Sequence, residues 1–261
     1  MKQRTLTGIA LAVVSLVLLC LFHLPFVPQI TTVCLGLGAV WEILEAYKVK
    51  SGLYKAACFA YALVLPWVPL AQSRPVMLGM LLGGLAWFTY LMRCIGKPAK
   101  AYMPGVSVFF AIGLYRGLTA YGDMENGAWL LCMTGVVCAL TDIFAYLVGS
   151  RYGKHKLAYK VSPGKSVEGA LGGLAASVVI VALTAGPVFG NVGTVAVYAA
   201  VASILGQWGD LSMSAVKRVA GVKDFGKIFP GHGGILDRCD SLMYPLAFTW
   251  LLYCAQIWIF V

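Results

Sequence analysis

The chain has 261 residues, of which 60% are hydrophobic and only 11% are charged, and its formal net charge is +10. Roughly a quarter of the residues of a soluble domain are charged, so this composition excludes an ordinary water-soluble fold. It indicates a membrane protein with several spanning helices. The eight cysteines are scattered without a CxxC pair, which argues against a zinc site or a redox pair.

The apolar stretches, taken in chain order, predict the helices. About 20 apolar residues are needed to cross the hydrocarbon core of a bilayer. Nine spans are expected, near residues 5–22, 26–45, 53–71, 74–94, 103–120, 127–149, 168–188, 191–211 and 241–260. The first has a basic flank like a signal peptide but no small-residue cleavage site, so we interpret it as a retained helix. We therefore expect an all-α polytopic membrane protein in one domain, residues 1–261.

The basic residues predict the orientation of these spans. With a cytoplasmic N-terminus, every Lys and Arg except Arg74 and Arg116 falls on the cytoplasmic side. This asymmetry is expected because Lys and Arg resist translocation. The two longest loops, 150–167 and 212–240, lie on the same side, so we expect the active face there. For the lysines of the shorter loops, we favour a topological role and general attraction to anionic lipid.

A dense group of polar and charged residues lies near the C-terminus. Ionisable side chains beside apolar segments are costly to desolvate, so such a group is a functional-site hypothesis by default. Residues three and four apart share a helix face, which places Ser214 beside Asp210 and Lys217 one turn further. Asp237, Asp240 and Ser241 follow at the start of the last span.

The three carboxylates of this group, Asp210, Asp237 and Asp240, have two readings. Oxygen ligands suit Mg²⁺, which takes one or two carboxylates together with substrate phosphates. The same acids can instead form ion pairs with nearby Lys and Arg side chains. The spacing alone leaves both readings open.

The segment Pro230-Gly231-His232-Gly233-Gly234 separates these acids. Glycine amides without side chains can cradle phosphate oxygens, and a tight return between helices would need the same glycines. Lys217, Arg218, Lys223 and Arg238 surround the segment in sequence and could add positive charge. His232 can donate to a phosphate or transfer a proton, although a local hydrogen bond is the commoner role.

A second polar cluster begins inside the sixth predicted span with Asp142. A carboxylate within an apolar helix must face a polar cavity or a partner. Lys165 and Glu168, at the start of the seventh span, could share that cavity. The alternative is an interhelical hydrogen bond from Asp142 to a Ser, Thr or Lys.

At these residues the chain resembles the phosphatidate cytidylyltransferases, also called CDP-diacylglycerol synthases. The pattern Ser-x-x-Lys-Arg-x4-Lys-Asp, Pro-Gly-His-Gly-Gly and Asp-Arg-x-Asp-Ser runs from Ser214 to Ser241. The elements Thr-Asp-x-Phe-Ala-Tyr, Gly-Lys-His-Lys and Ser-Pro-x-Lys-x-x-Glu-Gly upstream also match. The resemblance is strong over residues 141–245 and rests on helical layout in the first half.

The resemblance implies transfer of a cytidylyl group from CTP to phosphatidate for phospholipid synthesis. It implies Mg²⁺, K⁺ as a second cation, a homodimer, no nucleic-acid partner and, for a bacterial source, an inner-membrane enzyme whose site faces the cytoplasm. The catalytic residues it implies are Asp210, Lys217, Arg218, Lys223, Asp224, His232, Asp237, Arg238 and Asp240. The metal ligands would be Asp210, Asp237 and Asp240. Substrate binding would fall to Asp142, Lys165, Glu168, Ser214, Gly231, Gly233, Gly234 and Ser241.

The chain departs from the family pattern at a few positions. Met213 stands where the family usually has Glu, Cys239 replaces an aliphatic residue, and Gly164 and Val167 replace Lys and Trp. Three other functions stay open at this point. These are a CTP-dependent polyprenol or phytol kinase, a transporter of an anionic solute, and a catalytically silent scaffold.

Overall fold

The computed structural model describes residues 2–68, 74–189, 191–226, 228–229 and 233–255, without the side chains of 2–6 and 74. Helices α1 to α6 are Lys2–Leu21, Val27–Ala46, Gly52–Val64, Arg74–Cys94, Met103–Tyr115 and Gly117–Gly122, with a 3₁₀ turn, η1, at Leu65–Trp67. The second half comprises α7 (Gly127–Tyr152), β1 (Lys156–Ala158), β2 (Ser162–Ser166), α8 (Val167–Ala185), α9 (Val192–Ala220), α10 (Leu236–Cys239) and α11 (Met243–Cys254).

Five of the described helices are long and apolar enough to cross a membrane, namely α2, most of α4, α7, α8 and α9. Thr7–Leu21 and α11 are shorter apolar helices. The expectation of a mostly helical membrane protein is confirmed, whereas the count of nine spans is not. Large apolar side chains such as Leu53, Trp129 and Val197 are exposed, as expected of helices that face lipid.

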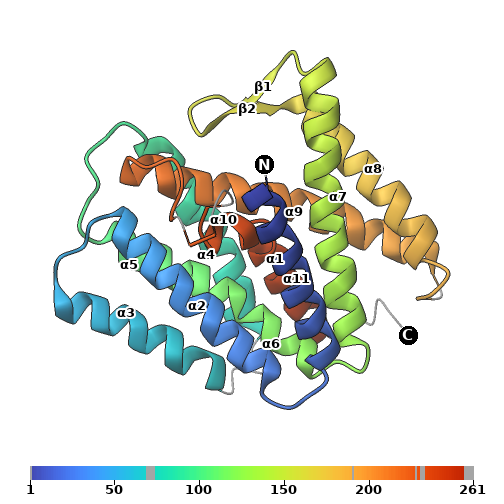
Figure 1. Ribbon diagram of the computed structural model, residues 1–261, viewed down its shortest axis with the longest axis horizontal. Coiled ribbons are helices and arrows are strands. Elements are labelled where there is room, and N and C mark those ends of the chain that lie inside the picture. The colour runs from blue at the N-terminus through green and yellow to red at the C-terminus, as the bar shows by residue number, and fades with distance from the viewer. Residues whose placement is uncertain (1, 69–73, 190, 227, 230–232, 256–261) are drawn as a thin grey trace.

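Small residues bring the helices of the second half close together. Figure 1 shows α7 and α8 as neighbours along one side of the protein. A Cβ built on Gly173 would lie 2.4 Å from the carbonyl oxygen of Thr141, and one on Gly169 would lie 2.6 Å from that of Ala145. Small residues at such contacts allow backbones to approach closely in membranes.

A buried chain of hydroxyl groups ties α6, α7, α9 and α11 together. Thr134 is 3.2 Å from the Tyr121 hydroxyl and 2.6 Å from the Tyr198 hydroxyl, and Tyr198 is 2.8 Å from Thr249. Polar side chains inside an apolar bundle are stable when they satisfy one another. This chain fixes the lower half of the bundle, as seen in Figure 1, where α6 and the end of α11 meet.

Helix α9 extends further than predicted, because it continues past residue 211 to Ala220. The predicted loop 212–240 therefore begins nine residues too early. The helix ends at Gly221, whose φ of 77° is left-handed, and the amide of Val222 donates to the carbonyl of Lys217. Glycine supplies this conformation without steric cost. Ser214, Lys217 and Arg218 consequently lie on a rigid helix.

The predicted loop 150–167 contains a β-hairpin that the all-α expectation omitted. Strands β1 and β2 are antiparallel, with Lys156 opposite Ser166, and the hairpin projects beyond the end of α7 (Figure 1). The Ser166 hydroxyl accepts a hydrogen bond from the amide of Gly169 and so caps α8. Arg218 of α9 donates from Nε to the carbonyl of Val161 at 3.1 Å, which holds the hairpin against α9.

The predicted span 103–120 is divided at Arg116, which separates α5 from α6. The pattern of basic residues predicts Arg116 on the outer side of the membrane, and in the structure its side chain is buried among the helices. It donates to the carbonyls of Leu65 and Val68, at 3.2 and 3.1 Å, and lies 4.9 Å from the Trp250 ring centre. The carbonyls at the end of a helix lack intrahelical donors, and the Arg116 guanidinium donates to two of these carbonyls.

Helix α9 also packs closely against the segment that joins α10 to α11. A Cβ on Gly209 would lie 2.3 Å from the Asp240 carbonyl oxygen, and one on Gly206 would lie 3.2 Å from that of Ser241. The two glycines on one face of α9 therefore set the distance between α9 and this segment.

We predict that Gly209→Ala destabilises the protein by about 3 kcal/mol, because the added methyl collides with backbone that cannot rotate away. The measurement is the thermal unfolding midpoint in one detergent. Gly135→Ala in α7 is the matched control, since a Cβ there would meet nothing within 4 Å. Equal midpoints for the two variants would contradict the proposed close contact.

Candidate active site

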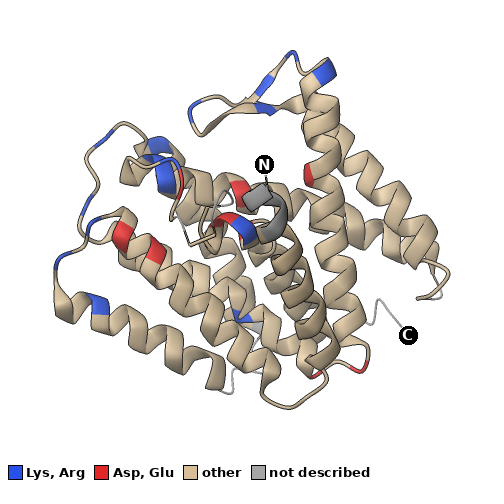
Figure 2. Ribbon diagram, in the orientation of Figure 1, with Lys and Arg blue, Asp and Glu red and all other residues tan. Residues whose placement is uncertain are grey.

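Side-chain contacts join the elements that carry the polar residues of the C-terminal half. They link β2 to α9, α9 to α10, and α2 to the residue that precedes α10. Figure 2 shows that Lys and Arg gather at this end of the bundle, on the hairpin and on the loops around it, with acidic residues among them. The predicted clustering of the charged residues of α9, α10 and β2 is therefore visible in space.

Asp237 is held by a buried ion pair and by two backbone amides. Its Oδ1 is 2.7 Å from Lys217 Nζ, and its Oδ2 accepts from the amides of Gly234 and Phe225 at 2.9 and 3.1 Å. Burial favours the neutral acid, but the hydrogen bonds from Lys217 and Gly234 outweigh it and hold the pKa of Asp237 below its ordinary value. Asp237 thus fixes both ends of the segment between α9 and α10.

Asp210 is paired in the same way with the hairpin. The ammonium of Lys165, on β2, contacts Oδ2 of Asp210, and the Ser214 hydroxyl lies 3.4 Å from Oδ1. Both partners of the ion pair are partly exposed, so solvent can reach it. The helical spacing that placed Ser214 beside Asp210 is confirmed.

Asp240 differs from these acids because it has no described cation partner. Its side chain is buried, and Oδ1 accepts the amide of Ser241 at 2.9 Å. Among the residues that the structure describes, no Lys, Arg or His forms an ion pair with it. Burial, reinforced by the negative charge of Asp210, raises the pKa of Asp240 to about 7. A buried acid without a counter-charge is a place where a cation is favourable.

The three predicted metal ligands are not gathered into one group. Within the described ranges, no three acid, His or Cys side chains lie together as a metal-binding set. Asp237 instead has its oxygens occupied by Lys217 and amides. Asp210 and Asp240 nevertheless fit Mg²⁺ with a bound phosphate, since this ion needs only one or two carboxylates from the protein.

Glu42 of α2 is a site residue that the sequence analysis did not select. Its side chain is 1% exposed, yet it lies 193 residues before its partners in sequence. Oε1 accepts the amide of Ile235 at 2.6 Å, and Oε2 accepts that of Leu236 at 2.8 Å. A Cβ on Gly234 would lie 2.1 Å from Oε1, so only glycine fits there. The sequence does contain a signal for Glu42, because an acid inside an apolar span indicates a buried partner. The sequence does not show which residue that partner is.

The glycine-rich segment is only partly described. Gly231 and His232 lie outside the described residues, so their predicted roles stay predictions. Gly233 has a φ of 87° and exchanges two backbone hydrogen bonds with Phe229. The amide of Gly234, predicted to face a phosphate, donates to Asp237. Gly233 and Gly234 therefore form a tight return before α10.

The remaining charged candidates differ in exposure. Arg218 donates to the carbonyls of Val161 and Val222, while Lys223 and Asp224, after α9, and Arg238, on α10, are exposed. The exposed side chains are free to meet a ligand that enters from water. Ser241 is buried and supports Asp240 through its amide.

The residues of the second cluster lie at two places. Glu168 accepts hydrogen bonds from the amides of Lys154 and His155 and contacts the His155 ring, so it closes the base of the hairpin. Asp142 is exposed on α7, and the charges that act on it are those of Asp210, Lys165 and Arg238. The charge of Lys165 acts on Asp142, whereas Glu168 binds the amides at the base of the hairpin; the shared cavity stays a prediction.

Met213, which stands where a Glu was expected, is 0% exposed and belongs to the apolar core. Its side chain is therefore packed among apolar residues. Within this chain, position 213 supplies no ligand to the site.

Comparison with known proteins assigns the chain to a family. Residues 2–255 match the model of the cytidylyltransferase family. The chain belongs to the cytidylyltransferase family. It is similar to the phosphatidate cytidylyltransferase of Staphylococcus aureus, with 32% identity over 94% of this chain and 96% of the relative. The phosphatidate cytidylyltransferase of Bacillus subtilis is 30% identical, with 97% of both chains covered.

A third relative is similar over a shorter stretch. The uncharacterized protein YnbB of Escherichia coli is 41% identical over 136 residues, which are 51% of this chain and 45% of that protein. The family model and the full-length matches include the N-terminal half that contains Glu42.

We predict that Glu42→Ala lowers cytidylyltransferase activity at least tenfold and destabilises the protein by about 2–4 kcal/mol. The variant leaves two buried amides, of Ile235 and Leu236, without an acceptor. Hydrogen exchange at these two amides, measured together with activity, locates the effect. Glu45→Gln is the control, because Glu45 lies one turn further along α2 and is exposed. Unchanged exchange at both amides in Glu42→Ala would contradict the role assigned to Glu42.

Proposed function

We propose that the chain transfers the cytidylyl group of CTP to phosphatidate, which gives CDP-diacylglycerol and pyrophosphate. The observation that carries this proposal is the similarity to phosphatidate cytidylyltransferases over nearly the whole chain. The paired acids and lysines at one end of the helices are suited to such a reaction, because both substrates are anionic phosphates.

The reaction needs little covalent chemistry from the protein. A phosphate oxygen of phosphatidate attacks the α-phosphorus of CTP, and the bond from that phosphorus to the bridging oxygen of the β-phosphate breaks. Pyrophosphate leaves with the electron pair. The protein must align the two phosphates and offset the negative charge on the attacking and leaving oxygens.

The acids Asp210 and Asp240 are our proposed ligands for Mg²⁺, which when bound supplies positive charge to the phosphate oxygens. The uncompensated burial of Asp240 beside Asp210 supports this assignment. Asp237 was predicted as a third ligand, but its contacts with Lys217 and two amides favour a positioning role. K⁺ as a second cation remains a proposal that rests on the family resemblance.

Lys217, which pairs with Asp237, is the proposed partner of the triphosphate, and Lys165, which pairs with Asp210, is the proposed partner of the lipid headgroup. Lys165 contacts Asp210, and Lys217 contacts Asp237, so each ammonium is held close to where a phosphate would bind. Lys223 and Arg238 are exposed and can meet the nucleotide as it enters from water. Positive charge held in place before the reaction costs no reorganisation during it.

The lipid substrate is proposed to approach along α7. Asp142 is exposed on this helix next to Ile143 and near Tyr146, whose side chains are 53% and 74% exposed. An apolar helix face with one polar position can keep acyl chains in the bilayer while the headgroup reaches Lys165. An inner-membrane location, a site on the cytoplasmic side and a homodimer belong to the same proposal. The crowding of Lys and Arg at one end of the bundle supports the orientation (Figure 2).

We predict that label from α-³²P-CTP, but not from γ-³²P-CTP, enters a chloroform-soluble product when the purified protein is given phosphatidate and Mg²⁺. Cytidylyl transfer keeps the α-phosphorus on the lipid, whereas a CTP-dependent lipid kinase would transfer the γ-phosphorus. Label from γ-³²P-CTP alone would therefore replace this proposal with the kinase. Protein without phosphatidate is the control.

We predict opposite effects on stability for two substitutions that both remove one negative charge. Asp240→Asn abolishes transfer but leaves the folded protein as stable or more stable, because it removes a buried charge without a partner. Asp237→Asn destabilises by about 3 kcal/mol, because it leaves Lys217 buried and unpaired. Activity and thermal unfolding, measured in the same preparation, test both. Full activity in Asp240→Asn would remove Asp240 from the proposed metal site.

A further inference from the structure

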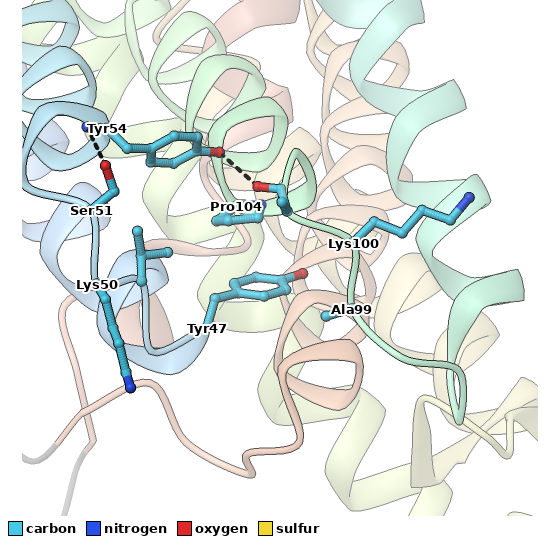
Figure 3. A pocket seen from close by; sticks show the side chains of 9 residues that line it. Tyr47, Lys50, Ser51, Tyr54, Ala99, Lys100 and Pro104 are labelled. Atoms are coloured by element: carbon cyan, nitrogen blue, oxygen red, sulfur yellow. Dashed lines mark hydrogen bonds between the residues drawn. The ribbon is translucent and has the colours of Figure 1, made fainter.

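A cavity of about 300 Å³ lies between the loop that joins α2 to α3 and the loop that joins α4 to α5. Tyr47, Lys50, Ser51 and Tyr54 line it from the first loop and the start of α3, and Lys100 and Pro104 line it from the second. Figure 3 shows the Tyr47 ring lying across the cavity between the two loops. None of these residues belongs to the acid and lysine pairs of the candidate active site.

The walls of this cavity carry positive charge only. Residues 47–55 and 95–102 contain Lys48, Lys50, Lys55, Lys97 and Lys100 but no Asp or Glu. None of the five lysines forms an ion pair with another described residue. In Figure 3, Lys50 and Lys100 extend away from Tyr47 in different directions, so their ammonium groups flank the cavity without filling it. An anion, and not a cation, is the favourable occupant.

The cavity also offers hydroxyl donors. The buried hydroxyl of Tyr47 has no hydrogen-bond partner of good geometry among the described residues. The nearby Ser107 hydroxyl accepts from the Trp87 indole at 3.1 Å and keeps a second lone pair, so it is an alternative partner for Tyr47. Ser51 accepts from the Tyr54 amide, which leaves its own hydroxyl hydrogen free to donate. The Tyr47 hydroxyl is enclosed in the free protein, so a phosphate oxygen would accept from it only after the side chains around it shift on binding.

Aromatic residues next to the cavity indicate its depth in the membrane. The hydroxyls of Tyr90 and Tyr102 are 3.1 Å apart, Trp87 packs against both rings, and Lys100 Nζ is 5.9 Å from the Tyr102 ring centre. Tyr90 and Tyr102 are partly exposed. Trp and Tyr collect where hydrocarbon meets headgroups, so the cavity opens at the level of lipid phosphates.

We propose that this cavity binds the headgroup phosphate of an anionic phospholipid from the surrounding leaflet. Basic pockets between membrane helices are suited to such headgroups. A lipid is favoured over free phosphate because apolar surface borders the polar wall. Val49, Ala99 and Pro104 line the cavity, and Leu53, beside Ser51, is 84% exposed. The site is separate from the proposed transfer reaction and does not depend on it.

The test is a titration of the delipidated full-length protein with phosphatidylglycerol, followed by native mass spectrometry. This lipid is chosen because its phosphate is a diester, unlike the monoester phosphate of phosphatidate, the proposed substrate. The double variant Lys50→Gln, Lys100→Gln is expected to weaken the tightest binding about thirtyfold. That factor corresponds to about 2 kcal/mol, or about 1 kcal/mol for each lysine. Lys156→Gln, Lys160→Gln, in the hairpin, removes the same charge elsewhere and is expected to change binding less than threefold.

Tyr47→Phe separates a built site from general attraction between lysines and anionic lipid. The variant keeps every charge and removes only a hydroxyl without a partner, so it should not destabilise the fold. About fivefold weaker binding of phosphatidylglycerol is expected if this hydroxyl donates to the phosphate. Unchanged binding, or equal losses in the two double variants, would overturn the site.

A competition experiment distinguishes the two sources of phosphate. Inorganic phosphate at 100 times the lipid concentration is expected to displace little phosphatidylglycerol, because it lacks the apolar contacts. Complete displacement would overturn the lipid assignment in favour of free phosphate. Binding of phosphatidylcholine as tight as that of phosphatidylglycerol would also overturn it, because the lysines would then make no contribution.

Discussion

The carboxylates of Glu42 and Asp237 hold the segment between α9 and α11 by its backbone amides, and the arrangement of the site depends on this interaction. Glu42 binds the amides of Ile235 and Leu236, while Asp237 binds those of Gly234 and Phe225. The segment has little regular structure of its own, so these four amides would otherwise need other partners. Once they are satisfied, Asp240 is fixed against α9 at Gly209, where it faces the charge of Asp210.

The acids and lysines of the site follow the ion-pair reading of the sequence pattern at two of the three acids, and the metal reading stays a proposal. The spacing of Asp210, Asp237 and Asp240 allowed either a metal site or ion pairs. In the structure, Lys165 and Lys217 neutralise two of the acids, and Asp240 stays buried without a described cation. Lysines that pair with acids in this way are also positioned for phosphates. In the proposed reaction, Lys165 would be released for a substrate phosphate by Mg²⁺ at Asp210 and Asp240, while Lys217 stays paired with Asp237.

Much of the fold could be predicted from the sequence, because the dominant signal in a membrane protein is the length of its apolar stretches. The pattern from Ser214 to Ser241 likewise identified most residues of the candidate site. Boundaries set by backbone geometry were harder to predict. The sequence around Lys217 is polar enough to resemble a loop, yet α9 continues to Gly221 because the hairpin and the core cover its sides.

Contacts between distant parts of the chain could not be predicted from spacing at all. Glu42 and Arg116 were visible as charges in or near apolar stretches, but their partners are backbone groups, which every residue carries. A buried charge indicates that a partner exists, but it does not show which residue provides it. The β-hairpin was missed because its strands are short and show no alternation of apolar and polar side chains.

The contact between Glu42 and the amides of Ile235 and Leu236 limits how such a site can be inherited. The recognisable motif lies in the second half of the chain, yet the acid that shapes its loop comes from the second helix. A motif copied into another helical bundle would leave two amides unsatisfied unless the recipient had an acid in the same place. The motif of the second half therefore cannot be transferred alone to another protein. Substitutions at Glu42 and in the segment that it binds must remain compatible.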